Sequence, residues 1–152
     1  MNKEFKVILV MNLMYNLFLA LILSAAAQVM SMGGIHFPAI IGDILMAYVL
    51  EMIIALGLPF SKWGMALGEK YARPGSLKYR CLMTTGTAVP FAILMCLGMS
   101  LIGSVLIAHL PISVWFHAFL GMLPVFIVLG WVLSFFFVPF FMGLARKIVF
   151  KE

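Results

Sequence analysis

Long stretches of the chain contain no charged residue. Asp, Glu, Lys and Arg are absent from residues 7–30 and again from residues 81–145. An α-helix needs about 20 apolar residues to cross a bilayer, so the second stretch is long enough for two crossings. Together with the polar and turn-forming residues that interrupt the rest of the chain, this pattern predicts four membrane-spanning helices. Their expected ranges are 7–30, 38–60, 82–108 and 113–141.

The breaks between these spans consist of residues that end helices. Residues 33–34 (Gly-Gly) and 109–111 (His-Leu-Pro) mark two short turns. The middle break is longer and contains residues 73–75 (Arg-Pro-Gly), after which Ser76 is a suitable N-cap for the third span. The segment from Ser61 to Tyr71 is expected to continue as a helix along the cytoplasmic interface.

All ten basic residues fall on one side of this arrangement. They precede the first span, lie between the second and third spans, or follow the fourth: Lys3, Lys6, Lys62, Lys70, Arg73, Lys78, Arg80, Arg146, Lys147 and Lys151. Cytoplasmic loops of membrane proteins carry such an excess of Lys and Arg. We therefore expect a multi-pass protein of the cell (inner) membrane with both termini in the cytoplasm.

The composition agrees with a lipid environment and excludes several classes of protein. The 152 residues are 65% hydrophobic and 10% charged, and their mean hydropathy is +1.19. A soluble domain has about 25% charged residues, and a disordered chain combines low hydrophobicity with high charge. The basic pI of about 9.5 follows from the one-sided Lys and Arg, so we expect the lipid bilayer as partner and no nucleic acid.

The two halves of the chain resemble each other at an offset of 80 residues. Residues 58–60 (Leu-Pro-Phe) align with residues 138–140 (Val-Pro-Phe), and basic residues follow both. Each half has an even number of spans, so the repeats would be parallel. We expect a single all-α, polytopic membrane domain (1–152) with four transmembrane helices. They would form two parallel-repeat helical hairpins, 7–72 and 82–147.

A row of small residues at every fourth position supports the repeat. In the third span it comprises Thr84, Ala88, Ala92, Cys96, Ser100, Ser104 and Ala108. In the first span the aligned row comprises Asn12, Asn16, Ala20, Ser24 and Gln28. Such rows let membrane helices approach closely, so the third-span row from Ala88 to Ser104 is expected to pack against a neighbouring helix. The first-span row differs because three of its members are amides.

A hairpin whose second helix ends in this proline motif before a basic end resembles the small two-helix bacterial inner-membrane proteins that form a domain of unknown function. The residues that carry the resemblance are Leu58-Pro59-Phe60 with Lys70, and Val138-Pro139-Phe140 with Arg146-Lys147. Here the unit would occur twice in tandem and cover most of the chain. The resemblance implies an inner-membrane location and no particular activity.

Two acidic residues lie inside the second span. Counted from the cytoplasmic ends of their spans, Glu51 and Asn16 both lie about 14 Å deep, and Asp43 and Ser24 about 26 Å deep. A charge inside the bilayer is costly, so such residues usually face a bundle interior and find partners. We expect the polar row of the first span to face the two acids. The resulting intramembrane polar site comprises Glu51, Asp43, Asn16, Asn12, Ser24 and Tyr48.

Two functions fit this polar site. A protonatable acid in the middle of the membrane, with Tyr48 on a similar face, suits a small proton- or cation-coupled transporter or channel. Four helices rarely enclose a path alone, so this form would be a homo-oligomer. Alternatively, Glu51 is a neutral acid that hydrogen bonds to Asn16 and fixes the helix register. The protein would then be a non-transporting module that assembles with another membrane protein.

The sequence supports neither an enzyme nor a cofactor. It contains no Gly-rich phosphate loop, and no catalytic triad can be assembled at the depths of its serines. His36, Met30 and Met32 are close in sequence, and thioether and imidazole groups suit soft metal ions. Met is also a common space-filling residue in membrane proteins, and the three histidines suit the outer water boundary. We therefore expect no bound metal.

Overall fold

The computed structural model describes residues 2–151, and these residues form helices and short connections without any strand. The helices are α1 (Lys3–Met32), α2 (Ala39–Gly57), α3 (Phe60–Tyr71), α4 (Leu77–Leu101), the π-helix η1 (Ile102–Ile107) and α5 (Ile112–Phe150). Four segments are long and apolar enough to cross a membrane: α1, α2, α4 with η1, and α5. The prediction of an all-α protein with four such helices is confirmed.

Local sequence explains several helix ends. The Ser76 hydroxyl accepts a hydrogen bond from the Tyr79 amide at 3.1 Å and caps the start of α4, as expected. The first span, α1, ends at Met32. The next residue, Gly33, has a positive φ of 73°, which places it in the left-handed region that glycine adopts without strain. Leu58 is extended, so α2 ends at Gly57 before the first aligned proline.

The fourth span differs from its expected range because α5 does not end near residue 141. It continues for 39 residues, or about 58 Å, which is well beyond the hydrophobic thickness of a bilayer. Pro139 lies inside it and leaves the carbonyl group of Phe135 without its helical donor. The guanidinium group of Arg80 donates to that carbonyl oxygen at 2.6 Å and so satisfies the acceptor that the proline leaves free.

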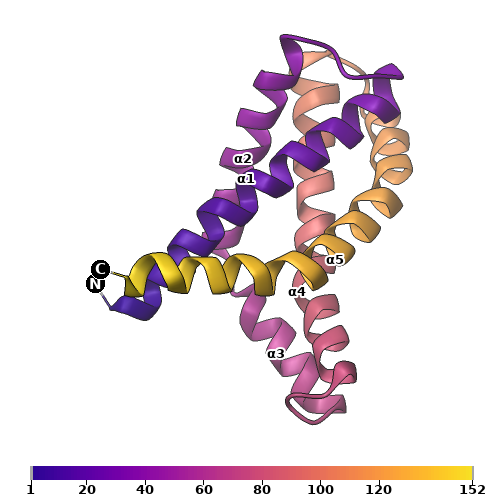
Figure 1. Ribbon diagram of the computed structural model, residues 1–152. Helices are drawn as coiled ribbons and strands as arrows, with labels where there is room; N and C mark the ends of the chain where they lie inside the picture. The colour runs from indigo at the N-terminus through magenta and orange to yellow at the C-terminus, as the bar shows by residue number, and fades with distance from the viewer. Residues whose placement is uncertain (1, 152) are drawn as a thin grey trace.

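The two halves of the chain interlock. The α3 helix packs against the start of α4, and the end of α5 packs against the start of α1. Figure 1 shows these pairs as two diverging legs, with both termini at the tip of the α1–α5 leg. The last element of each half therefore packs against the first element of the other half, as expected for parallel repeats around one axis.

The first helices of the two halves also share a burial pattern at the offset of 80 residues. The buried pairs are Tyr15 and Met95, Asn16 and Cys96, Leu19 and Met99, and Ala20 and Ser100. These residues belong to or line the central core, where α1 and α4 face α2 and α5. The α1 row and the α4 row thus share buried positions in their middle parts, at Asn16 with Cys96 and at Ala20 with Ser100.

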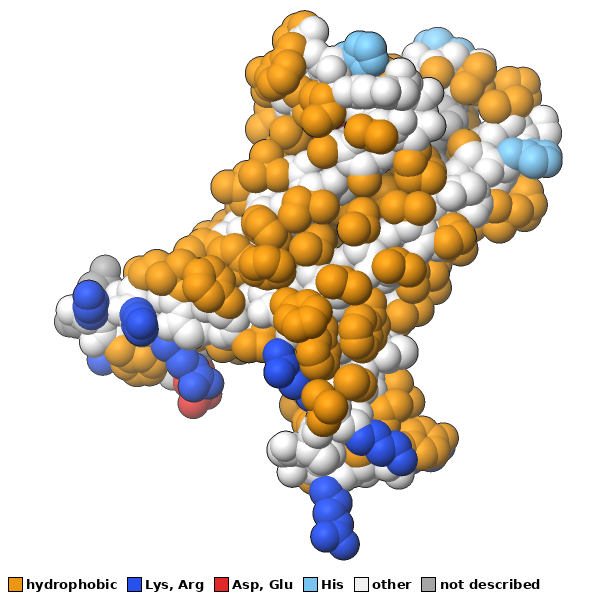
Figure 2. All heavy atoms as spheres, turned by 45° about the vertical axis from the view of Figure 1, so that its right-hand side comes forward, with side chains coloured by type: hydrophobic (Ala, Val, Ile, Leu, Met, Phe, Trp, Pro, Cys, Tyr) orange, Lys and Arg blue, Asp and Glu red, His pale blue; other side chains and the backbone are white. Residues whose placement is uncertain are grey.

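Charge separates the two ends of the molecule. Figure 2 shows Lys and Arg side chains gathered at the tips of the two legs and His side chains at the opposite end. We call these the basic end, which carries the ten Lys and Arg residues, and the histidine end, which carries His36, His109 and His117. The surface between them is largely hydrophobic in this view, as expected for a surface that faces lipid.

Candidate functional site

The seam between α1 and α2 contains most of the buried polar side chains of the first half. On α1, Asn16, Ser24 and Gln28 are buried, and Asn12 is half-buried on the same row. Because these positions differ by multiples of four, they lie along one face of α1. On α2 the facing positions are Asp43, Ala47 and Glu51, which also differ by four.

Glu51 is the most unusual of these residues. Its side chain is 0% exposed, and among residues 2–151 neither carboxyl oxygen has a hydrogen-bond partner. The hydroxyl group of Ser24 is likewise 0% exposed and without a partner in the same part of the chain. Buried polar groups are normally hydrogen bonded, because leaving one unpaired costs free energy. Two unpaired groups on facing helices therefore need an explanation.

Asn16 lies beside Glu51 but does not hydrogen bond to it. Its side-chain amide instead donates to the Met52 sulfur at 3.3 Å. Nearby, the Tyr48 hydroxyl donates to the Leu13 carbonyl oxygen at 3.4 Å. Asn16 thus lies within one residue of the expected position opposite Glu51, but the expected hydrogen bond between Asn16 and Glu51 is not formed.

At the histidine end of the seam, Asp43 lies opposite Gln28 and not Ser24. The Gln28 amide nitrogen donates to the Asp43 carboxylate at 2.6 Å, and the Gln28 amide oxygen accepts from the His36 backbone N–H at 3.0 Å. The expected partner of Asp43 was therefore one turn off, whereas near Glu51 the difference is one residue.

Four residues that contact the polar seam or its helices lie outside the site expected from the sequence: Gln28, Met52, Tyr15 and Ser134. Gln28 shares the four-residue row of Asn16 and Ser24, and this row was the signal that could have identified it. Tyr15 and Ser134 join α1 to α5 through hydroxyl groups 2.7 Å apart. No sequence signal connects these two residues, because they are 119 positions apart.

The second half has no acid at the aligned positions. Trp131 replaces Glu51 there, and its indole N–H donates to the Thr85 hydroxyl at 3.0 Å. Leu123, which aligns with Asp43, packs against the core. On the α4 row Ala88, Ala92, Cys96 and Ser100 are buried, whereas Ser104 is partly exposed where α4 gives way to η1. The unpaired carboxyl group therefore belongs to the first half only.

The three residues considered for a soft metal ion lie on the surface of the histidine end. Met30, Met32 and His36 are all exposed, and the His36 Nε2 atom faces the Met32 carbonyl oxygen at 3.5 Å. Within residues 2–151, no group of three His, Cys, Asp or Glu side chains is placed to hold a metal ion.

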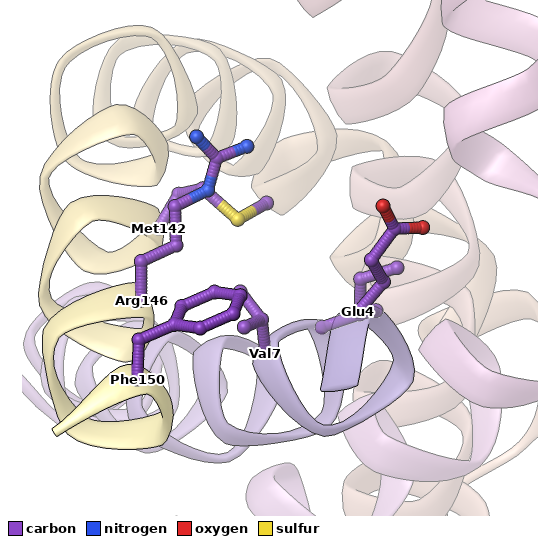
Figure 3. Close-up of a pocket in the computed structure, with 6 residues that line it drawn as sticks. Glu4, Val7, Met142, Arg146 and Phe150 are labelled. Carbon is purple, nitrogen blue, oxygen red and sulfur yellow. The ribbon is translucent and has the colours of Figure 1, made fainter. Parts of the chain in front are cut away.

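A hollow of about 550 Å³ lies in the α1–α5 leg at the basic end. Figure 3 shows Met142, Arg146 and Phe150 on the α5 side of it and Val7 and Glu4 on the α1 side. None of its lining residues belongs to the polar seam, so the hollow gives no access to Glu51.

Comparisons with known proteins add no further identification. No family model matches the chain, and no curated protein or solved structure does so either.

Proposed function

We propose that this protein is a small membrane carrier or channel that moves protons or small cations, with Glu51 as the acid that binds the ion. The observation that carries the proposal is the enclosed, unpartnered carboxyl group of Glu51. Ionisable residues inside membrane helices are costly, and they mark ion pathways and proton relays.

The surroundings of Glu51 support an occluded state of such a carrier. A carboxylate with neither oxygen hydrogen bonded would be very unfavourable in this apolar interior, so the closed conformation suits the neutral acid. Release of the ion would then require water or a polar partner to reach Glu51. The buried Ser24 hydroxyl, also unpaired among residues 2–151, lies along the same seam.

We further propose that the basic end faces the cytoplasm and that the protein lies in the cell inner membrane. The support is the separation of ten basic residues from three histidines at opposite ends of the molecule. Since four helices rarely enclose a path alone, the transporting form is proposed to be a homo-oligomer.

A flux measurement tests the role of Glu51. The wild-type protein and Glu51→Gln are purified, reconstituted into proteoliposomes and assayed for proton, Na⁺ and K⁺ flux under an imposed gradient. Glu51→Gln keeps the size of the side chain but removes its ability to bind an ion, so we expect flux to fall to the level of empty vesicles. Glu69→Gln is the matched control, because Glu69 is exposed on α3. Equal flux through wild type and Glu51→Gln would contradict the proposal.

The complete enclosure of Glu51 favours one alternative. A neutral acid that is closed to water could serve only to fix the packing of α1 and α2 within a module that assembles with another membrane protein. In that case Glu51→Gln would alter the unfolding midpoint in detergent, and the wild-type protein would give no flux above empty vesicles. Unchanged stability with lost flux would instead support the carrier.

A further inference from the structure

Two successive levels of the α1–α2 seam separate Glu51 from the histidine end of the molecule. The outermost contains Gln28 and Asp43, which hydrogen bond to each other. One turn deeper are Ser24 on α1, above Ala20, and Ala47 on α2, and Glu51 lies a further turn deeper on α2. Apart from Asp43, all these side chains are buried.

The outermost level is held by one side chain. Gln28 is 2% exposed, and its amide group bridges two other parts of the chain. It donates to Asp43 on α2 and accepts from the backbone N–H of His36 in the connection between α1 and α2. Loss of this amide would release α1, α2 and their connection from one another at the same point.

The levels below Gln28 are suited to hold water once they are open. Ala20 and Ala47 are both 0% exposed, and they are the smallest side chains on the facing rows. The Ser24 hydroxyl and the Glu51 carboxyl are the two groups there that lack partners among residues 2–151. A buried water needs two to four polar partners, and these two groups would supply them.

The opposite direction is closed by several layers. Between Glu51 and the basic end, the Asn16 amide hydrogen bonds to the Met52 sulfur on α2. In the same region the Tyr15 hydroxyl group is hydrogen bonded to the Ser134 hydroxyl group on α5. Phe18 packs against Phe137 and Phe141 in the same region, with ring centroids 4.8 and 5.5 Å apart. Towards the histidine end, the Gln28 amide forms the hydrogen bonds that join α1 to α2 and their connection, beside core side chains such as Leu23 and Ile44.

We propose that Gln28 and Asp43 form the closure of an ion route that leads from the histidine end to Glu51, with Ser24 as the intermediate polar step. The inference rests on the proposed function for what passes along the route. Gln28 is a positioning residue in this scheme, because it acts through Asp43 and the connection and not on the ion itself. Separation of the pair admits water to Ser24 and then to Glu51.

Cysteine accessibility tests the closure without measuring flux. Cys81 and Cys96 are replaced by Ala in the full chain, Ser24→Cys is introduced, and labelling by a small charged methanethiosulfonate reagent is followed from the histidine end. We expect slow labelling in this background. Gln28→Ala should accelerate it about tenfold to a hundredfold, the range expected when a hydrogen bond to a charged group is lost from the closed state. Asp43→Ala is the second variant and should have the same effect.

Two controls make the result specific. Ser31→Ala removes a hydrogen bond at the same end that lies entirely within α1, so it should leave the labelling rate of the cysteine at position 24 unchanged. Asp43→Asn retains an acceptor oxygen and should keep labelling slow. If Gln28→Ala and Asp43→Ala both label at the background rate, the closure is refuted.

The result is independent of the flux measurement on Glu51. Accelerated labelling together with full flux through Glu51→Gln would uphold the closure but overturn the proposed carrier. Unchanged labelling together with lost flux through Glu51→Gln would refute the closure but support the proposed carrier.

Discussion

At the scale of single residues, the interior polar groups fall into two sets. Tyr15 with Ser134, and Gln28 with Asp43, are hydrogen bonded between elements and hold α1 in place. Glu51 and Ser24 are buried and lack a partner in residues 2–151. The first set joins elements of the closed state, whereas the second costs free energy in that state. That cost is why we assign the ion-binding role to Glu51, with the Gln28–Asp43 pair as the closure of the route to it.

The bond between Tyr15 and Ser134 gives a prediction about stability. Ser134→Ala leaves the buried Tyr15 hydroxyl unpaired, so we expect the free energy of unfolding to fall by about 1 kcal/mol, a typical value for hydrogen bonds between membrane helices. Tyr15→Phe in the same background removes the unpaired hydroxyl and should recover part of that loss. Reversible unfolding in mixed detergent measures both values. If the single and double variants lose equal stability, the hydroxyl groups are not coupled.

At the scale of elements, the two aligned proline motifs have different outcomes. At Pro59 the chain leaves the helix, because Gly57 favours helices weakly and the residue before a proline favours the extended conformation. At Pro139 the helix continues, and Arg80 donates to the carbonyl group that the proline leaves free. Arg80 also lies 4.3 Å from the ring centroid of Phe135. A contact from another helix therefore satisfies the backbone group that the proline leaves unpaired.

The α3–α4 leg depends on close approach of two backbones, and this gives a prediction at the same scale. A Cβ atom on Gly64 would lie 2.5 Å from the Met83 carbonyl oxygen and closer still to the Thr87 hydroxyl. Gly64→Ala should therefore push α3 away from α4 and lower the free energy of unfolding by about 1–3 kcal/mol, the usual cost of overpacking. Detergent unfolding measures the loss.

Gly143 provides the matched control for this substitution. It lies in the α1–α5 leg, and a Cβ atom there would have no heavy atom within 4 Å. Gly143→Ala should be neutral or slightly stabilising, because alanine favours helices more than glycine does. Equal stability of the two variants would show that the Gly64 contact does not limit the packing of α3.

At the scale of the whole molecule, the fold is stabilised by contacts between its two halves. Contacts join α1 to α5, α3 to α4 and α2 to α4, so each half covers apolar surface of the other. The acid occurs on one side of this repeated frame only, since Trp131 occupies the position aligned with Glu51. The frame is thus repeated, whereas the proposed site is single.

Interlocking predicts that the connection between the halves is dispensable once the protein has folded. A protease site inserted at Gly75, in the exposed loop between α3 and α4, allows the full chain to be cut after purification in mild detergent. We expect the two fragments to elute together from a size-exclusion column and to separate only under denaturing conditions. Separation in mild detergent would contradict the interlocked packing.

Much of the fold follows from residue types alone. The lengths of the apolar stretches identify the four spanning helices, because a helix must satisfy its own backbone in lipid. The Ser76 cap is a local feature of the same kind. The contact at Pro139 could not be predicted, because the donor to the freed Phe135 carbonyl group belongs to Arg80 on another helix.

The sequence by itself determined that the protein belongs in lipid, that it has one basic end, and that the small and polar row of α1 is buried. These properties depend on the number and period of side chains along one helix. Only the tertiary structure decided which side chains meet across the α1–α2 seam. Asp43 meets Gln28, Asn16 meets Met52, and Glu51 meets no polar partner among residues 2–151. The register between two helices depends on where each one ends and what covers it, and one turn of displacement exchanges every partner.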